Sequence, residues 1–251
     1  MSDDLRAPAE AIRAADHVVA FTGAGISTAS GIPDFRSDGG IWDQFDPAEF
    51  HYQRFKRDPA GFWEKRLELY DTIFDAAIEP NAAHEALGRL EEAGELDAVI
   101  TQNIDGLHQA AGSGTVIELH GNGQRVVCDD CGRRTTLAET RRRIADGELP
   151  PRCGECSGSL KPDVVLFGEE LPEPTMQAAR RHAREAELFL AIGSSLTVEP
   201  AASLPRIARR TGGSVLVVNL EEPDLARTPD FEFRDDVTAL LPALAERVDP
   251  S

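Results

Sequence analysis

Short apolar runs alternate along this chain with longer segments in which apolar residues recur every three or four positions. The short runs are typical of buried parallel strands, and the longer segments are typical of amphipathic helices. Helices are predicted at residues 5–16, 80–93, 174–185, about 200–210 and 237–248. Because strand and helix alternate with short turns, we predict an α/β fold with a doubly wound, parallel, Rossmann-like sheet. The predicted strands are residues 17–21, 97–101, 116–119, 188–192 and 215–218.

Two segments interrupt the alternation. Residues 37–75 are rich in aromatic and charged residues, several of them at helical spacing. We expect a small helical insert that packs its own aromatic core; the alternative is a mobile element that closes over a ligand. Residues 123–162 contain all four cysteines of the chain. We expect residues 161–169 to return from this second insert to the main sheet.

The two cysteine pairs are Cys128-x-x-Cys131 and Cys153-x-x-Cys156, with residues 132–152 between them. Two such pairs are the ligand pattern of a tetrahedral zinc site, and four thiolates leave no open position, so the metal would be structural. Disulfides are the competing interpretation, but intracellular thiols stay reduced. The small second lobe is therefore predicted to combine a helical insert with a four-cysteine zinc ribbon.

Acidic residues outnumber basic ones by 44 to 26, which gives a formal net charge of -18. The only lysines are Lys56, Lys65 and Lys161. An acidic surface in which arginine replaces lysine suits concentrated salt, where a Debye length of about 3 Å at 1 M screens the repulsion. We therefore expect a halophilic prokaryotic source; an ordinary acidic cytosolic protein is the alternative. Such a surface is unsuited to neutralising phosphates, so no direct nucleic-acid binding is expected.

No apolar run in the sequence reaches 18 residues. The first residues also lack the basic and apolar regions of a secretory signal. We therefore expect a soluble, cytoplasmic protein that does not bind membranes.

The first predicted strand leads directly into Gly23-Ala24-Gly25. Two glycines after a strand let the backbone approach a pyrophosphate at a helix N-terminus, although a simple tight turn would look the same. Thr28 stands where a dinucleotide fingerprint would have its third glycine. Pro33 cannot continue a helix, so residues 31–36 are predicted to form an ordered lid that carries an aromatic side chain, an acid and an arginine.

Polar side chains also follow the other predicted strands. In open α/β sheets, ligands bind at this edge, although a helix cap or a structural histidine is the simpler interpretation of each residue alone. A histidine at a strand end, beside an amide and a carboxylate, is a candidate general base. The residues are Gln102, Asn103, Ile104 and Asp105 after the second strand, His120 after the third, Gly193, Ser194 and Ser195 after the fourth, and Asn219, Leu220 and Glu221 after the fifth.

Together these motifs resemble the sirtuin family of NAD-dependent protein lysine deacylases. The motifs GAGIS, SGIPDFR, TQNIDGLH, ELHG, the two CxxC pairs, KPDVVLFGE, GSSLTVEP and VVNL occur in the family's order over nearly the whole chain. The resemblance implies that NAD is a consumed co-substrate. Nicotinamide leaves, and the acetyl group of acetyl-lysine passes to ADP-ribose to give O-acetyl-ADP-ribose. It also implies one structural zinc ion and, as partner, an acetylated lysine in an extended protein segment.

The resemblance further assigns roles to individual residues. His120 would be the general base, with Asn103 and Asp105 in the nicotinamide pocket. The peptide would be clamped by Val165, Phe167, Gly168 and Glu169. At Val237 the local sequence departs from the family pattern. The NAD contacts would be Gly23, Ala24, Gly25, Thr28, Phe35, Arg36, Gln102, Asn103, Ile104, Asp105, Gly193, Ser194, Ser195, Asn219, Leu220, Glu221 and Val237.

Acyl preference rests on a short segment of the helical insert. The branch that removes succinyl or malonyl groups carries Tyr-x-x-Arg, and this chain has Trp63-Glu64-Lys65-Arg66. We expect Arg66 to be a surface charge and the enzyme to prefer acetyl groups, with desuccinylation or demalonylation as an alternative. Mono-ADP-ribosylation is a second alternative, since it would use the same NAD site. One sirtuin-type domain is predicted over residues 1–251, with a large lobe of residues 1–36, 76–122 and 163–251 and a small lobe of residues 37–75 and 123–162.

Overall fold

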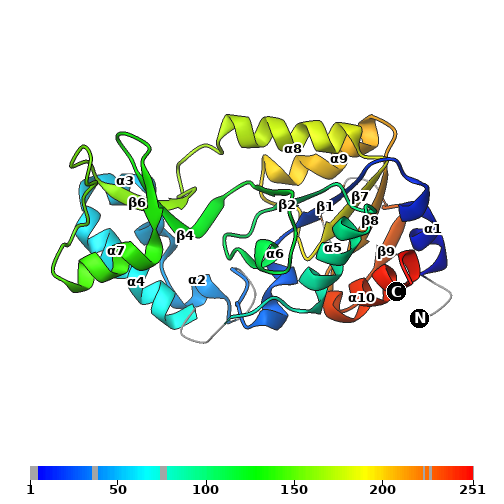
Figure 1. Ribbon diagram of the computed structural model, residues 1–251, viewed down its shortest axis with the longest axis horizontal. Helices are drawn as coiled ribbons and strands as arrows, with labels where there is room; N and C mark the ends of the chain where they lie inside the picture. The colour runs from blue at the N-terminus through cyan, green and yellow to red at the C-terminus, as the bar shows by residue number, and fades with distance from the viewer. Residues whose placement is uncertain (1–4, 36–38, 74–77, 223, 226–227, 251) are drawn as a thin grey trace.

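The structure is a computed structural model that describes residues 5–35, 39–73, 78–222, 224–225 and 228–250. Its main sheet has six parallel strands, and its second sheet has three antiparallel strands (Figure 1). The strand order of the main sheet reverses between β1 and β7. In spatial order its strands are β3 (Val116–Glu118), β2 (Ala98–Thr101), β1 (Val18–Thr22), β7 (Leu188–Ile192), β8 (Ser214–Val218) and β9 (Phe231–Phe233).

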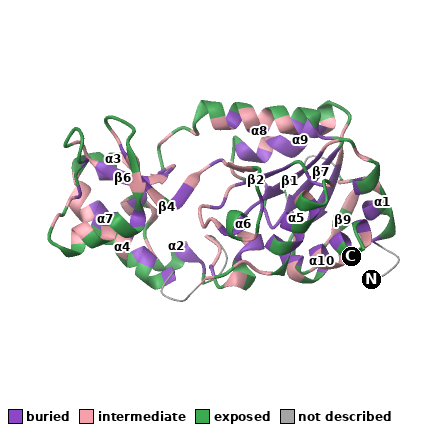
Figure 2. Ribbon diagram, viewed as in Figure 1, coloured by how far each residue is buried: buried purple, intermediate pink, exposed green. Residues whose placement is uncertain are grey.

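Helices cover both faces of the main sheet, which confirms the doubly wound, Rossmann-like prediction. One face carries α1 (Arg6–Ala14), α5 (Ala82–Glu92) and α10 (Val237–Val248). The other carries α8 (Glu173–Glu185) and α9 (Leu204–Arg210). Strands β1, β2 and β7 are buried along their whole length (Figure 2), which explains why their sequences are continuous apolar runs.

The second lobe joins both inserts. Residues 39–73 supply α2 (Ile41–Gln44), α3 (Tyr52–Arg57) and α4 (Pro59–Ile73), and the cysteine-containing segment supplies the remaining elements. Trp63 of α4 is fully buried and donates a hydrogen bond from Nε1 to the carbonyl of Leu160 at 2.8 Å. The elements of the cysteine-containing segment are β4 (Gly121–Cys128), β5 (Arg134–Thr136), α7 (Leu137–Ala145) and β6 (Leu160–Val164).

The aromatic residues of the insert do not form a core of their own, contrary to our expectation. They divide between two clusters. Phe55, Phe62, Trp63 and Tyr70 pack with the second sheet and with Cys128 and Cys153, whereas Trp42, Phe45 and Phe50 pack with Ile32 and Leu107. Three short strands bury too little apolar area by themselves, so the helical insert covers them. The expected return of residues 161–169 to the main sheet is also wrong, because β6 pairs with β4.

Three local features differ from the sequence prediction. Strand β9 was not predicted, because it has only three residues and shows no buried alternation. The glycine loop leads into two 3₁₀ turns, Ala24–Ile26 and Thr28–Ser30, and not into an α-helix. Gly31, at a φ of 90°, ends the second turn in a left-handed conformation that favours glycine. Among the described residues, no helix is long and apolar enough to cross a membrane.

Candidate active site at the carboxyl edge of the main sheet

The loops after β1 and β7 meet where the strand order reverses, which is the ligand crevice of open α/β sheets. Gly23 N–H donates to the carbonyl of Ile192 at 3.1 Å, and Gly25 N–H donates to that of Gly193 at 2.9 Å. A Cβ atom on Gly25 would lie 2.9 Å from Gly193 Cα. The glycines therefore allow two backbones to touch at the switch point.

Asn103 and Asp105 are joined through a residue that the sequence did not single out, Ser27. Asn103 Nδ2 donates to the carbonyl of Gly23 at 3.1 Å and to Ser27 Oγ at 3.0 Å. Ser27 Oγ in turn donates to Asp105 Oδ2 at 2.8 Å, and Asp105 Oδ1 accepts from Leu107 N–H at 2.9 Å. Ser27 is 1% exposed and Asn103 is 7% exposed, so this network is fixed inside the fold.

Two buried histidines lie behind this network. The rings of His84 and His108 are 4.9 Å apart and edge-on, and His84 Nε2 lies 3.4 Å from Ser27 Oγ. Burial lowers the pKa of His84 to about 4, against the opposing charge of Asp105. Burial, with His84 alongside, lowers the pKa of His108 to about 3. Both imidazoles are therefore neutral supports at pH 7.

Sequence reasoning missed Ser27, His84 and His108 because they lie far apart in the chain. The available signals were the motifs GAGIS and TQNIDGLH, which contain Ser27 and His108, and His84, a histidine on the apolar face of a helix three residues after its N-cap, Asn81. Asn81 Nδ2 also donates to the carbonyl of Ile26 at 2.8 Å, so the start of α5 is attached to the glycine loop.

His120 lies just before β4 and is half-buried. Its Nδ1 is 2.9 Å from the carbonyl of Gln102, an acceptor only, so Nδ1 carries the proton and Nε2 keeps its lone pair. Burial lowers the pKa of His120, against the raising effect of that hydrogen bond. The residue is thus neutral with a basic nitrogen available, as a general base requires.

Other predicted contacts lie on the same edge. Gln102 Nε2 donates to the buried Ser194 Oγ at 2.9 Å, which links β2 to β7 across β1. The side chain of Leu220, just after β8, is 71% exposed. Ala24, Thr28, Ile104, Ser195, Asn219 and Glu221 are half-buried or exposed on the loops of this edge.

Three further predicted NAD contacts are Val237, Arg36 and Phe35. The side chain of Val237, at the start of α10, is 6% exposed and packs into the core under the sheet. Arg36 lies outside the described residues. Phe35 is half-buried, with its ring 5.3 Å from that of Trp42.

The predicted peptide clamp joins the two lobes. Phe167 N–H donates to the carbonyl of Phe50 at 3.2 Å, and its own carbonyl accepts from Tyr52 N–H at 2.9 Å. Val165 N–H donates to the carbonyl of His120 at 2.9 Å. Glu169 Oε2 accepts from Leu166 N–H at 2.8 Å and from Lys161 Nζ of β6 at 2.8 Å. Gly168 and the 42% exposed side chain of Phe167 remain open to solvent.

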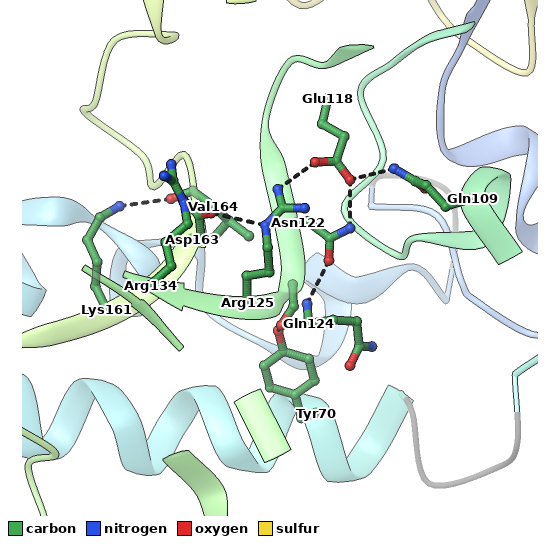
Figure 3. Close-up of polar contacts among 11 residues, drawn as sticks. Tyr70, Gln109, Glu118, Asn122, Gln124, Arg125, Arg134, Lys161, Asp163 and Val164 are labelled. Carbon is green, nitrogen blue, oxygen red and sulfur yellow. Dashed lines mark hydrogen bonds and ion pairs between the residues drawn. The ribbon is translucent and has the colours of Figure 1, made fainter. Parts of the chain in front are cut away.

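A cavity of about 540 Å³ lies on the other side of this segment, between β3, the second sheet and α8. It includes Val165 and Glu169 but none of the predicted NAD contacts. Figure 3 shows that Arg125 crosses from β4 to the main sheet, donating to Glu118 at 2.5 Å and to Asp163 at 3.1 Å. The cationic side chains that line the cavity, Arg125, Arg134 and Lys161, are all paired with carboxylates. We therefore infer that these ion pairs hold the lobes together.

The four cysteine sulfurs gather within 4.8 Å of one another. Cys128 Sγ is 3.5 Å from Cys156 Sγ, and Cys131 Sγ is 3.7 Å from Cys153 Sγ. Sulfurs bound to one zinc at about 2.3 Å, in tetrahedral geometry, lie about 3.8 Å apart. The distances fit a four-thiolate zinc site and are far too long for disulfides.

Arg66 is not the surface charge that we expected. It is 5% exposed, its guanidinium lies 4.6 Å from the centre of the Tyr70 ring, and its Nη2 donates to the Tyr70 hydroxyl at 3.1 Å. The Tyr70 hydroxyl donates to the carbonyl of Gly123 (Figure 3). Arg66 Nε is buried without a hydrogen-bond partner among the described residues.

Comparison with known proteins agrees with this arrangement. The model of the Sir2 family matches residues 23–200. An NAD-dependent protein deacetylase of Haloarcula marismortui, a halophilic archaeon, is 54% identical over 98% of this chain and 95% of its own length. The NAD-dependent protein deacetylase of Sulfolobus acidocaldarius is 45% identical over 98% of this chain and 96% of its own length.

Solved structures agree as well. A chain from a study of the mechanism and regulation of Sir2 enzymes is 42% identical, with a TM-score of 0.86 over 99% of this chain and 98% of that one. A Sir2 complex with p53 peptide and NAD⁺ is 36% identical, with a TM-score of 0.86 over 98% of this chain and 99% of that one. The motif resemblance is therefore confirmed, and the chain belongs to the Sir2 family.

Proposed function

We propose that this protein is an NAD-dependent protein lysine deacetylase that passes the acetyl group of acetyl-lysine to ADP-ribose and releases nicotinamide. The observation that carries the proposal is the hydrogen bond from His120 Nδ1 to the carbonyl of Gln102. His120 Nε2 is held as a base at the carboxyl edge of the sheet, close to the fixed Asn103–Ser27–Asp105 network. Relatives that align with nearly the whole chain are named NAD-dependent protein deacetylases.

The residues of this edge fit NAD. The glycine loops let a pyrophosphate approach the backbone, and Ser195, Asn219 and Glu221 offer polar groups beside the exposed Leu220. When bound, NAD would supply an electrophilic ribose carbon and a leaving nicotinamide. Asn103 and Asp105 would hold the nicotinamide end, since their positions are fixed through Ser27. Phe35 would exclude water from the reacting ribose, and His120 Nε2 would accept a ribose hydroxyl proton.

We propose that the protein substrate binds as an extended strand against residues 165–169. The main chain of Phe167 already bonds to Phe50 and Tyr52 on one side. Gly168 follows in an exposed left-handed turn, at a φ of 81°, where its N–H and carbonyl would be open to the substrate. Such binding reads main chain more than side chains. A structure in the same family that holds a p53 peptide supports a peptide substrate.

The remaining assignments complete the proposal. One zinc ion would be held by the four cysteines and would be structural, since four thiolates leave no open position. The large and small lobes would be divided at the residues predicted from the sequence. Reduced thiols fit the cytoplasm, where we place the protein.

A second candidate activity is removal of acidic acyl groups, and Arg66 favours it. A buried guanidinium with one unsatisfied N–H is a ready partner for a carboxylate. However, Arg66 already donates a hydrogen bond to the Tyr70 hydroxyl, and Trp63 Nε1 already donates one to the carbonyl of Leu160, so neither group is free for an acyl carboxylate. We therefore rank succinyl and malonyl groups below acetyl.

The deciding assay is nicotinamide release from NAD in molar salt, with and without an acetyl-lysine peptide, followed by mass spectrometry of the products. We expect release to depend on the acetylated peptide and to yield free lysine and O-acetyl-ADP-ribose. A peptide carrying ADP-ribose would identify a transferase. A faster rate on a succinyl-lysine peptide of the same sequence would reverse the ranking of acyl groups. Release without any acyl peptide would refute the proposal.

A further inference from the structure

A second group of potential metal ligands lies at the opposite, amino-terminal end of the main sheet. One ligand atom each from His17, His182 and Glu185 lies within 4.8 Å of the other two. His17 precedes β1, whereas His182 and Glu185 occupy the last turn of α8. The group is separate from the four cysteines and from the predicted NAD and peptide contacts.

Asp97 holds the ring of His17 in one tautomer. Its Oδ1 lies 3.3 Å from His17 Nδ1, and its Oδ2 accepts from Val18 N–H at 2.8 Å. A carboxylate beside Nδ1 keeps the proton there, so Nε2 carries a lone pair. A carboxylate behind a histidine also orients metal-binding imidazoles in proteins.

The lone pair of His17 faces a second imidazole. His17 Nε2 lies 3.2 Å from His182 Nδ1, and the two rings are inclined by only 18°. Two nitrogens bound to one zinc at about 2.0–2.1 Å, in tetrahedral geometry, lie about 3.3–3.4 Å apart. The two nitrogens therefore already have the spacing of one tetrahedral edge.

The surroundings favour a cation at this point. Backbone carbonyls at the end of α8 carry partial negative charge, because a helix dipole is negative at its C-terminus. Glu185 lies one helical turn from His182 and is exposed, and its carboxylate makes no hydrogen bond within the part of the chain that the structure describes. Since one of its oxygens lies within 4.8 Å of the imidazole ligand atoms, its carboxylate is free to join them around a metal.

His182 is also neutral near pH 7. Burial lowers its pKa most, and His17 and Arg181 lower it further, while Glu185 and Asp97 act in the opposite direction. A neutral imidazole is the form that binds metals.

We propose that His17, His182 and Glu185 bind a divalent transition-metal ion such as zinc, with Asp97 as the carboxylate that orients His17. Imidazole and carboxylate ligands suit zinc, nickel and copper, and three protein ligands leave a fourth position for water. On binding, His182 transfers its Nδ1 proton to Nε2 through solvent, so no net proton is released. The ion joins the end of α8 to the start of β1 and stabilises the sheet, independently of the proposed deacetylase activity.

The test is calorimetric titration of Zn²⁺ into tag-free protein whose cysteine site is already loaded with zinc. Molar salt and excess Mg²⁺ mask binding by the acidic surface. We expect a second equivalent of zinc per chain. At a hundred times its dissociation constant, it should raise the melting temperature by about 5–10 °C.

Variants identify the ligands. His17→Ala and His182→Ala should abolish the second equivalent, and Asp97→Asn should weaken it about 10–100-fold. Glu173→Gln, at the other end of α8, is the matched control and should leave zinc binding unchanged. If His17→Ala does not fold, His182→Gln on the helix surface carries the test.

The proposal is overturned if only the cysteine zinc is found, which would make the two histidines a hydrogen-bonded pair. It is equally overturned if the second equivalent survives both His182→Ala and His182→Gln.

Discussion

The two ends of the main sheet each bring a pair of histidines together, but in different surroundings. At the carboxyl end, His84 and His108 are at most 1% exposed and meet edge-on. At the amino end, His17 and His182 are half-exposed and nearly coplanar, with carboxylates beside them.

This difference decides what an imidazole can do. Burial keeps His84 and His108 neutral, although the charge of Asp105 opposes it at His84, and both serve as rigid supports behind Ser27 and the residues that it orients. Half-exposed histidines with carboxylate neighbours keep a lone pair open to a cation. His120 lies between these cases, because it is half-buried and its Nδ1 is fixed by a carbonyl while its Nε2 keeps a lone pair. Four experiments test this difference between the two ends of the sheet.

The largest effect is expected on removal of the zinc ion from the cysteines. This zinc must be counted separately from any metal at His17 and His182. Cys128→Ser should release one zinc per chain and unfold β4, β5 and β6, because structural zinc sites bind with about 10–16 kcal/mol. Metal analysis and hydrogen exchange measure both effects. The main sheet should keep its protection, and stoichiometric zinc in the variant would contradict the assignment.

The next effect concerns proton transfer at the carboxyl end. His120→Ala should reduce deacetylation by about 10²–10⁴-fold, the usual contribution of a general base. Zinc content and melting temperature should match the parent protein. Because the pKa of His120 is lowered, the parent's rate should be level near pH 7 and fall only in more acid solution. Near-normal turnover of the variant would remove His120 from the mechanism.

The buried pair should make the fold sensitive to acid. The pKa values of His84 and His108 fall to about 4 and about 3 in the folded state, from 6.5. Below pH 6.5 the unfolded chain therefore binds protons that the folded chain excludes. The free energy of unfolding should fall with pH from 6.5 towards 3–4, by up to about 1.4 kcal/mol per pH unit for each imidazole.

Urea unfolding at constant salt between pH 4 and 8 measures this slope. His108→Gln should make it shallower than in the parent protein, whereas His182→Gln at the half-exposed pair should change it less. Equal slopes in all three proteins would contradict the contrast between the two pairs.

The smallest effect tests the link between the buried pair and the site. Ser27→Ala removes the hydroxyl between Asn103 and Asp105, each of which keeps another hydrogen bond. We expect a loss of about 1–2 kcal/mol, seen as a roughly 10-fold lower kcat/KM at nearly unchanged zinc content. Unchanged kinetics would mean that Asn103 and Asp105 are positioned by the backbone alone.

Most of the main sheet could be predicted from the sequence, because buried parallel strands are continuous apolar runs. β7 begins and ends at the predicted residues, as does α10. The cysteine cluster could also be predicted from the sequence, because the two cysteines of each pair are only three positions apart. His120 and the residues after β2 could be placed at the carboxyl edge of the sheet because each follows an apolar run, whereas their roles stay predictions.

The rest depended on packing between distant segments. Ser27 is 57 positions from His84, and nothing local marks either residue as a partner of the other. His17 and His182 are 165 positions apart and meet only because α8 crosses back to the start of β7, beside β1. The shared core of the two inserts was missed for the same reason, as was the burial of Arg66.

The packing of α1 against α10 has a practical consequence for expression of the protein. Arg13 at the end of α1 donates to the carbonyl of Arg247 at 2.5 Å, close in sequence to His17. A polyhistidine purification tag would add imidazoles that compete with His17 and His182 for metal. Cleavable tags without histidine are therefore the appropriate choice for metal measurements on this protein.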